Sequence, residues 1–518
     1  MKNRSRTLKI YPTLCESVKL SVRKIAELTG ISKSAAHRHK KTILKRNDFP
    51  ESYLWESEEG LIFLKRLYYG SIILLCVQCG IGAKKLTEFF MFLRLDQHIG
   101  VKPSTIKKNA NEICEMLGKY KEEQEQTQLD KPLKIVGGID ETFFNEMILV
   151  LMDLSSGYLF VEEESDSKTY DTWYEKAKKV ADRFKIKFEY FVSDRAKQLI
   201  KLAVQGFKCS SIPDLFHASN ELVKQFGMSM NKKKANIQKK VAEAVAQLAL
   251  LKELSQDISA QEIIVNELQK QQEVINKGCS NYHEVLHRLS KTVHPFNIES
   301  LSPVTSAMVR IILYTILKDA EALKEEFNIS SKKNHLKKFK NQIEELASLI
   351  DIWWLWVDKR LQSDDISNDL RTWIKKYLLP LLYWEQQAGK TKNTNLKEAY
   401  QSAADKARLA FDEHPLTQEF IQNEEIISWA DWMVCNFQRT SSAVEGRNGW
   451  LTQMHHNGRG FTPKRLKAQT VFHNYYLKRP DGTTAAERLF RTKFPDPIEW
   501  VVERMGDLPL PRCMDVTY

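Results

Sequence analysis

The stretch FEYFVSDRAKQLIKLA (Phe188–Ala203) joins a strand-like run to a helix-like pattern at Asp194. The residues before Asp194 are mostly aromatic or apolar, which favours a strand in a buried sheet. The residues after it repeat apolar side chains at helical spacing. An acidic residue at this junction has two interpretations. It can cap the following helix, because Asp is a preferred N-cap residue, or it can belong to a site at the end of the strand.

A second acidic residue lies in a comparable setting upstream. The segment LKIVGGIDETFFNEMILVLMDLSSGYLFVEEES (Leu133–Ser165) predicts three consecutive antiparallel strands, with a hairpin turn at Ser155–Gly157. Asp140 falls inside the first of these strands, where a carboxylate is costly unless it is paired or bound to a metal ion. An amphipathic helix over residues 169–184 then precedes the strand that ends before Asp194.

This order of three strands, helix, strand and helix is typical of the ribonuclease H-like arrangement, in which the first and fourth strands are neighbours. We therefore expect Asp140 and Asp194 to meet at one edge of the sheet. Two close carboxylates repel each other unless a cation neutralises them. Oxygen ligands without paired Cys or His favour Mg²⁺ or Mn²⁺, and two such ions about 3.5–4 Å apart can clamp a phosphoryl group during in-line transfer.

A site of this kind commonly needs a third acid, and the best candidate is distant in the sequence. Glu445 lies in TSSAVEGRNGWLTQMHH (Thr440–His456), on a helix that we expect to begin at Thr440 or Ser441. Asn448 lies three residues further on and shares its helical face. Asp153, at the end of the second strand, is the alternative third ligand, although its position also suits a turn.

With these residues in place, the chain resembles the DDE transposases of bacterial insertion sequences. GIDETF, FVSDRAKQLIKLA and TSSAVEGRNG match the family's three acidic motifs, and PDLFH (Pro213–His217) is similar to the C/D-x-x-H motif of its hAT-like and Mutator-like branches. The match covers residues 131–227 and 435–478. The resemblance implies two Mg²⁺ or Mn²⁺ ions held by three carboxylates: Asp140, Asp194 and Glu445. It also implies side chains that support these ligands or contact phosphate: Asp214, His217 and Asn448.

The spacing of the acids departs from that of many family members, because Glu445 follows Asp194 by 251 positions. Some hAT-like relatives carry an all-helical insertion at this point, and the helical pattern of residues 228–428 fits such an insertion. The expected fold is a ribonuclease H-like α/β catalytic domain, interrupted by a large all-α insertion and preceded by α-helical helix-turn-helix units. The predicted domains are a helix-turn-helix region (1–125), two parts of the catalytic core (131–227 and 429–478), the helical insertion (228–428) and a C-terminal tail (479–518).

The segment VRKIAELTGISKSAAHRHKKTI (Val22–Ile43) has helix-turn-helix spacing, with Gly30 at the turn. Ile25, Ala26 and Leu28 should line one face of the first helix, and Ala35 and Ala36 of the second helix should face inward, although a plain helical hairpin is the alternative. The second helix should offer side chains to DNA: Lys33, Ser34, His37, Arg38 and Lys41. Lys84–Ile113 can form a second unit of this kind. Basic residues near the glutamate helix are further expected DNA contacts, with a solvated basic face as the alternative: Arg447, Arg459, Lys464 and Arg465.

Three tryptophans occur together in DIWWLWVDKRL (Asp351–Leu361). Trp353, Trp354 and Trp356 are either part of the helical core or a platform on which an unpaired base stacks.

Composition bounds the partners of the chain. The 518 residues contain 78 Lys and Arg against 66 Asp and Glu, a net charge of +12 that favours nucleic acid as partner. The first residues have no apolar signal core, and the apolar run Gly70–Gly82 is shorter than the roughly 20 residues that span a bilayer. We therefore expect a cytoplasmic protein without membrane contact. The resemblance further implies a bacterial, nucleoid-associated homo-oligomer.

The predicted function is metal-dependent cleavage and strand transfer of double-stranded DNA, acting on element ends and on target DNA. One alternative is a ribonuclease H-like nuclease or resolvase without strand transfer. Another is a DNA-binding regulator without catalytic activity.

Overall fold

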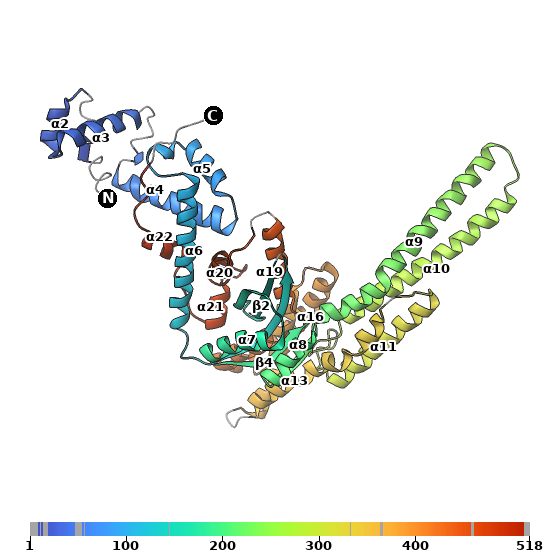
Figure 1. Cartoon of the computed structure of the whole chain (residues 1–518). Coiled ribbons are helices and arrows are strands. Elements are labelled where there is room, and N and C mark those ends of the chain that lie inside the picture. Colours follow the sequence, from blue (N-terminus) through green and yellow to red (C-terminus); the bar gives the residue numbers. More distant parts are fainter. Residues whose placement is uncertain are drawn as a thin grey trace.

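The structure of the chain, a computed structural model, describes residues 9–511 except 11, 14–18, 47–53, 56, 145, 332, 363–365 and 457–459. Helices make up most of the described residues, and the described strands form one five-stranded sheet (Figure 1).

The sheet agrees with the predicted α/β part of the chain. β1 (Leu133–Phe143), β2 (Met147–Asp153) and β3 (Leu159–Ser165) pair antiparallel in succession, and β4 (Ile186–Ser193) and β5 (Ser210–Pro213) extend the sheet in parallel on the other side of β1. The strand order is β3-β2-β1-β4-β5. The three antiparallel strands were predicted, as was the turn before β3, where Gly157 has φ +80°.

The register places acidic residues where the parallel pairing of three neighbouring strands ends, although β1 itself continues to Phe143 alongside β2. Gly138 of β1 pairs with Val192 of β4, so Asp140 and Asp194 each lie two residues beyond the same rung. Ser193 pairs with Pro213 of β5, and Asp214 follows directly. Because parallel strands end at the same edge of a sheet, all three carboxylates reach one edge.

Near the N-terminus, α2 (Val22–Thr29) and α3 (Lys33–Arg46) form the predicted helix pair. Ser21 caps α2, and Gly30 adopts φ +68° between the helices, as expected for the turn. Ala35 and Ala36 are buried, as predicted, and Ile25 is buried against α3, but Leu28 is 57% exposed and so does not share a buried face with Ile25. Ile25 and Ala26 together fill the contact on that side of α2.

The next helices are α4 (Glu58–Ser71), the π-helical η2 (Ile72–Gln78), α5 (Ala83–Phe92) and α6 (Pro103–Gln126). The polar run KYKEEQEQTQLDKP (Lys119–Pro132) has the composition of a linker, but α6 continues through it to Gln126. The Tyr120 hydroxyl donates to the Pro495 carbonyl (2.5 Å), and Glu125 accepts from the Tyr158 hydroxyl (2.7 Å). These two hydrogen bonds join the polar end of α6 to distant parts of the chain and so stabilise the helix there.

Together α4 and η2 form one helix, Glu58–Gln78, that is long and apolar enough to cross a membrane by length and composition alone. The apolar run is thus longer than predicted from residues 70–82. Leu64, Tyr68 and Ile72 of this helix are completely buried in a core that also contains residues of the sheet. One side of this helix therefore packs in the core, whereas Ile62 and Phe63 are exposed.

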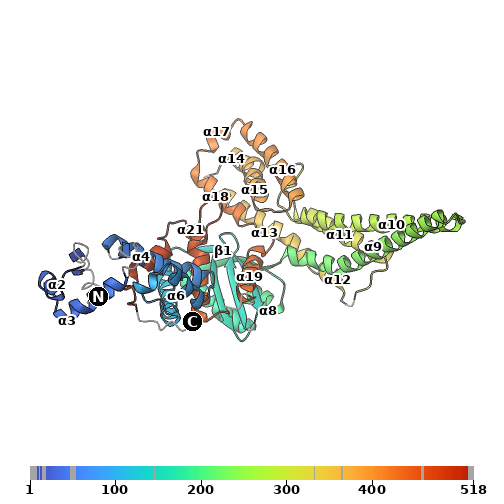
Figure 2. The same ribbon diagram turned by 90° about the horizontal axis from the view of Figure 1, so that it is seen from above.

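Between β5 and Cys435 the described residues are helical almost throughout, as predicted for residues 228–428, but the helices begin earlier, at Leu215. The first group is α9 (Leu215–Glu253), α10 (Ser259–Ser290), α11 (Ser306–Glu326), α12 (His335–Lys340) and α13 (Ile343–Leu361). The second is α14 (Asn368–Trp373), η5 (Ile374–Leu378), α15 (Leu379–Lys390), α16 (Thr394–Asp412), α17 (Thr417–Phe420) and α18 (Glu424–Cys435). Figures 1 and 2 show α9 and α10 projecting as a long arm, with α14–α18 grouped in a different direction.

Two large cores lie on the two faces of the sheet, and they cross the predicted domain boundaries. Val136 and Tyr190 face the core shared with the helical region and α19 (Ser442–Met454). Ile135 and Phe191 face the core shared with α4–α6 and α7 (Tyr170–Phe184). This second core also holds the last helices: α20 (Pro463–Val471), α21 (Ala485–Phe490) and α22 (Pro497–Arg504). Helices from both ends of the chain thus pack on one face of the sheet.

Candidate active site

Helix α19 crosses the sheet edge and brings Glu445 and Asn448 toward β1. The Asn448 side-chain amide donates to Asp140 Oδ2 over 2.8 Å. Glu445 lies almost one helical turn before Asn448 and so shares its face. The close approach depends on Gly138, because a Cβ there would lie only 2.8 Å from a methyl carbon of the buried Val444.

Asp140 interacts electrostatically with both of the other predicted acidic ligands. Burial, followed by the charges of Glu445 and then Asp194, raises the pKa of Asp140 to about 7. The negative charges of both other predicted ligands therefore disfavour ionisation of Asp140. Their mutual repulsion is the condition that a bound cation relieves.

The site offers the ligand chemistry that Mg²⁺ prefers, since its donors are carboxylate and amide oxygens. Asn448 Oδ1 is buried and has no hydrogen-bond partner among the described residues, so one further oxygen is available beside Asp140. No three Asp, Glu, His or Cys side chains in the described ranges already form a metal-binding group. Protein partners hold two of the acids instead: Asn448 binds Asp140 and His217 binds Glu445.

His217 and Asp214 act together at the start of α9. The His217 Nε2 atom lies 3.0 Å from Glu445 Oε1, and this contact is the largest cause of a raised His217 pKa and a lowered Glu445 pKa. Asp214 is buried and caps α9 by accepting from the Phe216 N–H (2.7 Å). Its other oxygen accepts from both the N–H (3.0 Å) and the hydroxyl of Ser441 at the start of α19. The PDLFH segment therefore positions the glutamate helix.

Asp194 combines features of both sequence interpretations. Its Oδ1 accepts from the Ala196 N–H (2.9 Å), but the N-cap of α8 (Lys197–Lys201) is Ala196 rather than Asp194. The intervening Arg195 adopts φ +68° and forms an ion pair with Glu345 of α13 (2.9 Å). Sequence reasoning missed this pair, since nothing near residue 345 signals a contact with the end of β4.

The rival carboxylates point elsewhere. Asp153 is the buried last residue of β2, and it accepts from Ser155 Oγ (2.7 Å) and the Ser156 N–H (2.9 Å) of the turn that follows. Its carboxylate therefore stabilises this turn, as its position suggested. Glu141 accepts from Trp173 Nε1 (3.1 Å) and Gln198 Nε2 (3.2 Å), on the face of the sheet opposite to that of Asp140.

The prediction that Arg447 contacts DNA is wrong. Its guanidinium forms two hydrogen bonds to the buried Glu162 (2.6 and 2.7 Å), and its side chain is 3% exposed. Burial raises the pKa of Glu162, but the charge and hydrogen bonds of Arg447, with one from Thr470, outweigh it and leave the pKa below its ordinary value. Arg447 thus fixes α19 to β3 and α20.

The other basic residues after Glu445, which were predicted to contact DNA, lie in different surroundings. Lys464 is exposed but pairs with Glu115 of α6 over 2.5 Å. Arg465 is half-buried and donates to the Gly460 carbonyl (3.2 Å). Arg459 lies outside the described residues. In α3, by contrast, all five predicted contact residues are exposed: Lys33, Ser34, His37, Arg38 and Lys41.

The tryptophan group belongs mainly to the core. Trp353 is 1% exposed and its Nε1 donates to the Met433 carbonyl (2.9 Å), so it cannot serve as a stacking platform. Trp354 packs edge-on against it, with ring centroids 4.9 Å apart, and donates to the Val304 carbonyl (3.1 Å). Trp356 is half-buried and packs on Tyr190 of β4. Trp353 is thus buried, and Trp354 and Trp356 are half-buried against the core, which agrees with the core interpretation.

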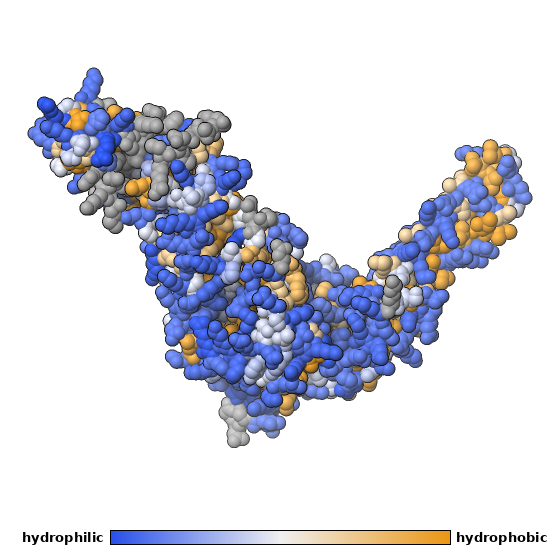
Figure 3. Space-filling view, viewed as in Figure 1, coloured by the Kyte–Doolittle hydropathy of each residue, from blue (hydrophilic) through white to orange (hydrophobic). Residues whose placement is uncertain are grey.

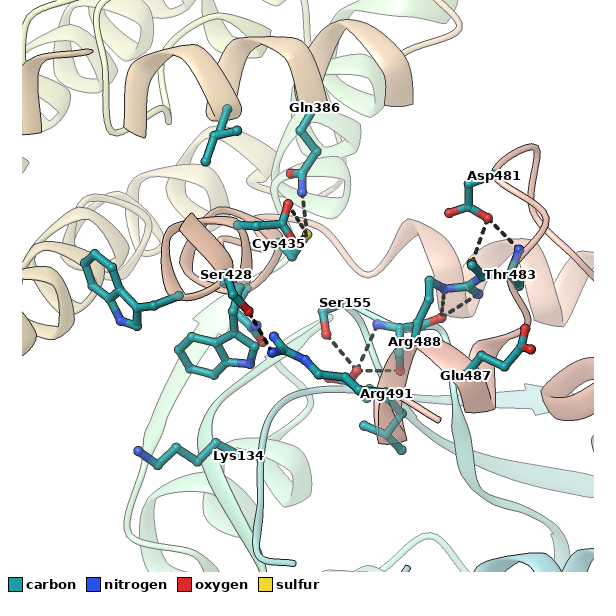
Figure 4. Close-up of a pocket in the computed structure, with 18 of the residues that line it drawn as sticks. Lys134, Ser155, Gln386, Ser428, Cys435, Asp481, Thr483, Glu487, Arg488 and Arg491 are labelled. Carbon is teal, nitrogen blue, oxygen red and sulfur yellow. Dashed lines mark hydrogen bonds between the residues drawn. The ribbon is translucent and has the colours of Figure 1, made fainter. Parts of the chain in front are cut away.

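A cavity of about 1150 Å³ lies at the other end of the sheet, where β1 begins and β2 ends (Figure 4). Arg488 donates there to the Ser156 and Thr483 carbonyls, and Arg491 donates to Ser428 Oγ. Five Lys and Arg residues line the cavity against six Asp and Glu residues, so its lining has no excess positive charge for a phosphate. The predicted acidic ligands lie at the opposite edge of the sheet.

Replacing Arg447 with Ala should lower the unfolding free energy by about 3–5 kcal/mol, because Glu162 would remain buried and unpaired. Chemical denaturation of the two proteins measures this difference. Lys464→Ala, which breaks an exposed pair, is the matched control and should change stability by less than about 1 kcal/mol. An Arg447→Ala protein of wild-type stability would contradict the assigned structural role.

The stability of the metal-free protein should fall as pH rises from about 4 to 7. Asp140 has a folded-state pKa near 7, above its ordinary value of 3.8, so the folded state binds its proton more tightly than the unfolded chain does. Its contribution is complete below pH 4 and is lost as pH rises through 7. Asp140→Asn removes this titration, so the difference in melting temperature between variant and wild type should grow in favour of the variant toward pH 8. A difference that stays constant with pH would contradict the raised pKa.

Comparison with known proteins identifies a family whose function is unknown. Residues 374–516 match a family described as "Family of unknown function (DUF6399)". No curated protein matches the chain. The matched stretch begins at η5 and includes Glu445 and Asn448, whereas Asp140 and Asp194 precede it.

Proposed function

We propose that the chain is a DDE-type DNA transposase that cleaves and joins DNA with the aid of Mg²⁺ or Mn²⁺. The observation that carries the proposal is that the register brings Asp140 and Asp194 to one sheet edge, where α19 binds Asp140 through Asn448 and carries Glu445, although 251 positions separate Asp194 from Glu445. The strand order β3-β2-β1-β4-β5, with β2 alone antiparallel to both of its neighbours, supports a ribonuclease H-like domain. The helices between β5 and α19 suit the insertion seen in hAT-like relatives.

In this proposal Asp140, Asp194 and Glu445 would hold two ions. When bound, such ions neutralise charge on the phosphate and activate the attacking oxygen. Asn448 orients the Asp140 carboxylate, and His217 orients that of Glu445. The Glu445 contact raises the pKa of His217 and so favours its protonated form, whose positive charge would suit contact with a DNA phosphate.

The proposed reaction has two in-line steps. Water attacks a phosphodiester at the element end and releases a 3′-hydroxyl, which then attacks a phosphodiester of target DNA. Neither step needs a covalent bond between protein and DNA. A DNA substrate of this kind places the protein in the cytoplasm at the nucleoid.

Recognition of the element end is assigned to α2 and α3. The exposed face of α3 carries His37, Arg38 and Lys41, which suit base edges and phosphates. Gly30 sets the turn that presents this helix.

Asp140→Asn and Asp194→Asn should each reduce DNA cleavage more than tenfold while DNA affinity stays near that of the wild type. The amide keeps the shape of the side chain but loses the charge that holds a divalent cation. The assay is Mg²⁺-dependent nicking of a plasmid that carries the sequences flanking this gene, with EDTA as the metal-free reference. Asp182→Asn on α7, an exposed carboxylate of the same domain, is the matched control.

Cleavage activity within tenfold of wild type for either site variant would contradict the assignment of these two aspartates as metal ligands. A wild-type protein that binds the flanks but never nicks them would identify a regulator. Nicking without joining to a second plasmid would identify a nuclease.

Replacing Arg38 and Lys41 with Ala in the full chain should weaken binding to flanking duplex DNA and flatten its salt dependence. Each lost phosphate contact reduces the slope of log affinity against log salt by about 0.9, so two contacts change it by roughly 2. Fluorescence anisotropy at several salt concentrations measures both quantities. Removing two exposed charges from α7, with Lys178→Ala and Lys179→Ala, should leave the slope unchanged, and an equal effect there would refute a specific role for α3.

A further inference from the structure

The arm formed by α9 and α10 leaves the rest of the protein at a definite level. At its base, His335 of α12 contacts Glu221 of α9 (2.6 Å), and the Phe327 ring that follows α11 packs against Gly278 of α10. Beyond that level, residues 228–277 project away from the rest of the described chain (Figures 1 and 2).

This projecting part exposes more apolar surface than a solvated helix pair needs. Ala244 and Val265 are buried between the two helices. Large apolar side chains also lie on the outside, at 44–86% exposure: Met228, Val245, Leu250, Leu254, Ile263, Ile264 and Val274. Figure 3 shows apolar side chains gathered over the outer end of the arm. A helix that is apolar on several sides is normally buried, so we expect another protein surface to cover these side chains.

Charge divides the arm into two halves. Gln261 donates to the Ala244 carbonyl (2.9 Å), so α9 residue 241 lies near the level of α10 residue 264. The outer half, residues 241–264, has one Lys against four acids, a net charge of −3. The inner half, residues 228–240 and 265–277, has seven Lys against two acids, a net charge of +5.

We propose that the arm binds the arm of a second copy of this chain, side by side and antiparallel about a two-fold axis. Each outer half then lies on the inner half of the other copy. The pairing sets −3 against +5 twice and covers the apolar outer ends, and the four helices form an antiparallel bundle. A parallel arrangement would set +5 against +5 and −3 against −3. The inference stands independently of the proposed function.

The size of the surface suits a stable dimer. Twenty-six residues of α9, from 228 to 253, span about 39 Å at about 1.5 Å per residue, and two helices side by side are about 20 Å wide. The face thus measures roughly 800 Å² per copy, which matches the roughly 800 Å² per partner of a standard protein interface.

The first test is the mass of the full chain in solution, measured by light scattering or sedimentation in about 50 mM salt. The wild type should be a dimer at micromolar concentration, and Leu250→Glu with Ile263→Glu should weaken the dimer about a hundredfold. Leu409→Glu on α16, at a leucine with 62% exposure, is the matched control and should remain dimeric. Circular dichroism checks that all three proteins are folded. A monomeric wild type, or a dimer that survives both arm substitutions, overturns the proposal.

The second test reverses charges and distinguishes the alignment. Lys232, Lys233 and Lys234 are changed to Glu in one variant, and Glu253, Asp257 and Glu262 to Lys in another. Each variant alone should lose dimer affinity at least tenfold, because halves of like sign then meet. The chain that carries both sets should recover, since its halves have opposite signs again. Failure to recover overturns the antiparallel alignment, and loss of DNA affinity without loss of the dimer would assign the lysines to DNA instead.

Discussion

The hydrogen bonds from Ser441 to the buried carboxylate of Asp214 join segments that are 227 positions apart. The adjoining Leu215 N–H donates to the Arg439 carbonyl (3.0 Å), so the chain departs into the helical region and returns from it at one point. Because a buried carboxylate is costly without partners, these bonds strongly favour the closed arrangement. The position of α19, and with it that of Glu445, depends on this junction.

The closed junction is what allows three acids to be grouped. The strands bring Asp140 and Asp194 to the edge by register alone, but Glu445 has no strand to place it. Asp214 sets the start of its helix, Arg447 fixes that helix to β3 through Glu162, and Gly138 permits the close approach. The grouping is unfavourable by itself, as the raised pKa of Asp140 shows, so these contacts have to outweigh carboxylate repulsion. Side chains whose pKa is shifted by burial and by neighbouring charges are common at functional sites.

The sequence predicted the parts of this fold that depend on local patterns. Runs of apolar and aromatic residues predicted β1–β4, Gly30 predicted a turn, and the position of Asp153 suited a turn. The errors involve residues whose surroundings come from distant segments. Arg447 looks like a solvent-facing base until Glu162 from β3 is placed beside it, and α6 looks like a linker until Tyr158 binds Glu125. Arg195 and Glu345 were missed for the same reason, since no local pattern links positions 150 residues apart.

The helix that carries His217 also forms one side of the arm, and this continuity links two otherwise separate parts of the molecule. α9 runs without a break from Leu215 to Glu253, a length of about 58 Å at about 1.5 Å per residue. An α-helix resists bending, so the direction of the arm is set where α9 is anchored, at its Asp214 cap and at the Glu221 contact with His335. A second copy bound to the arm would therefore be held at a definite orientation to the Glu445–His217 pair rather than through a flexible tether. In the antiparallel pairing the two sheets lie at opposite ends of a four-helix bundle, and the length of α9 sets the spacing of their carboxylate edges.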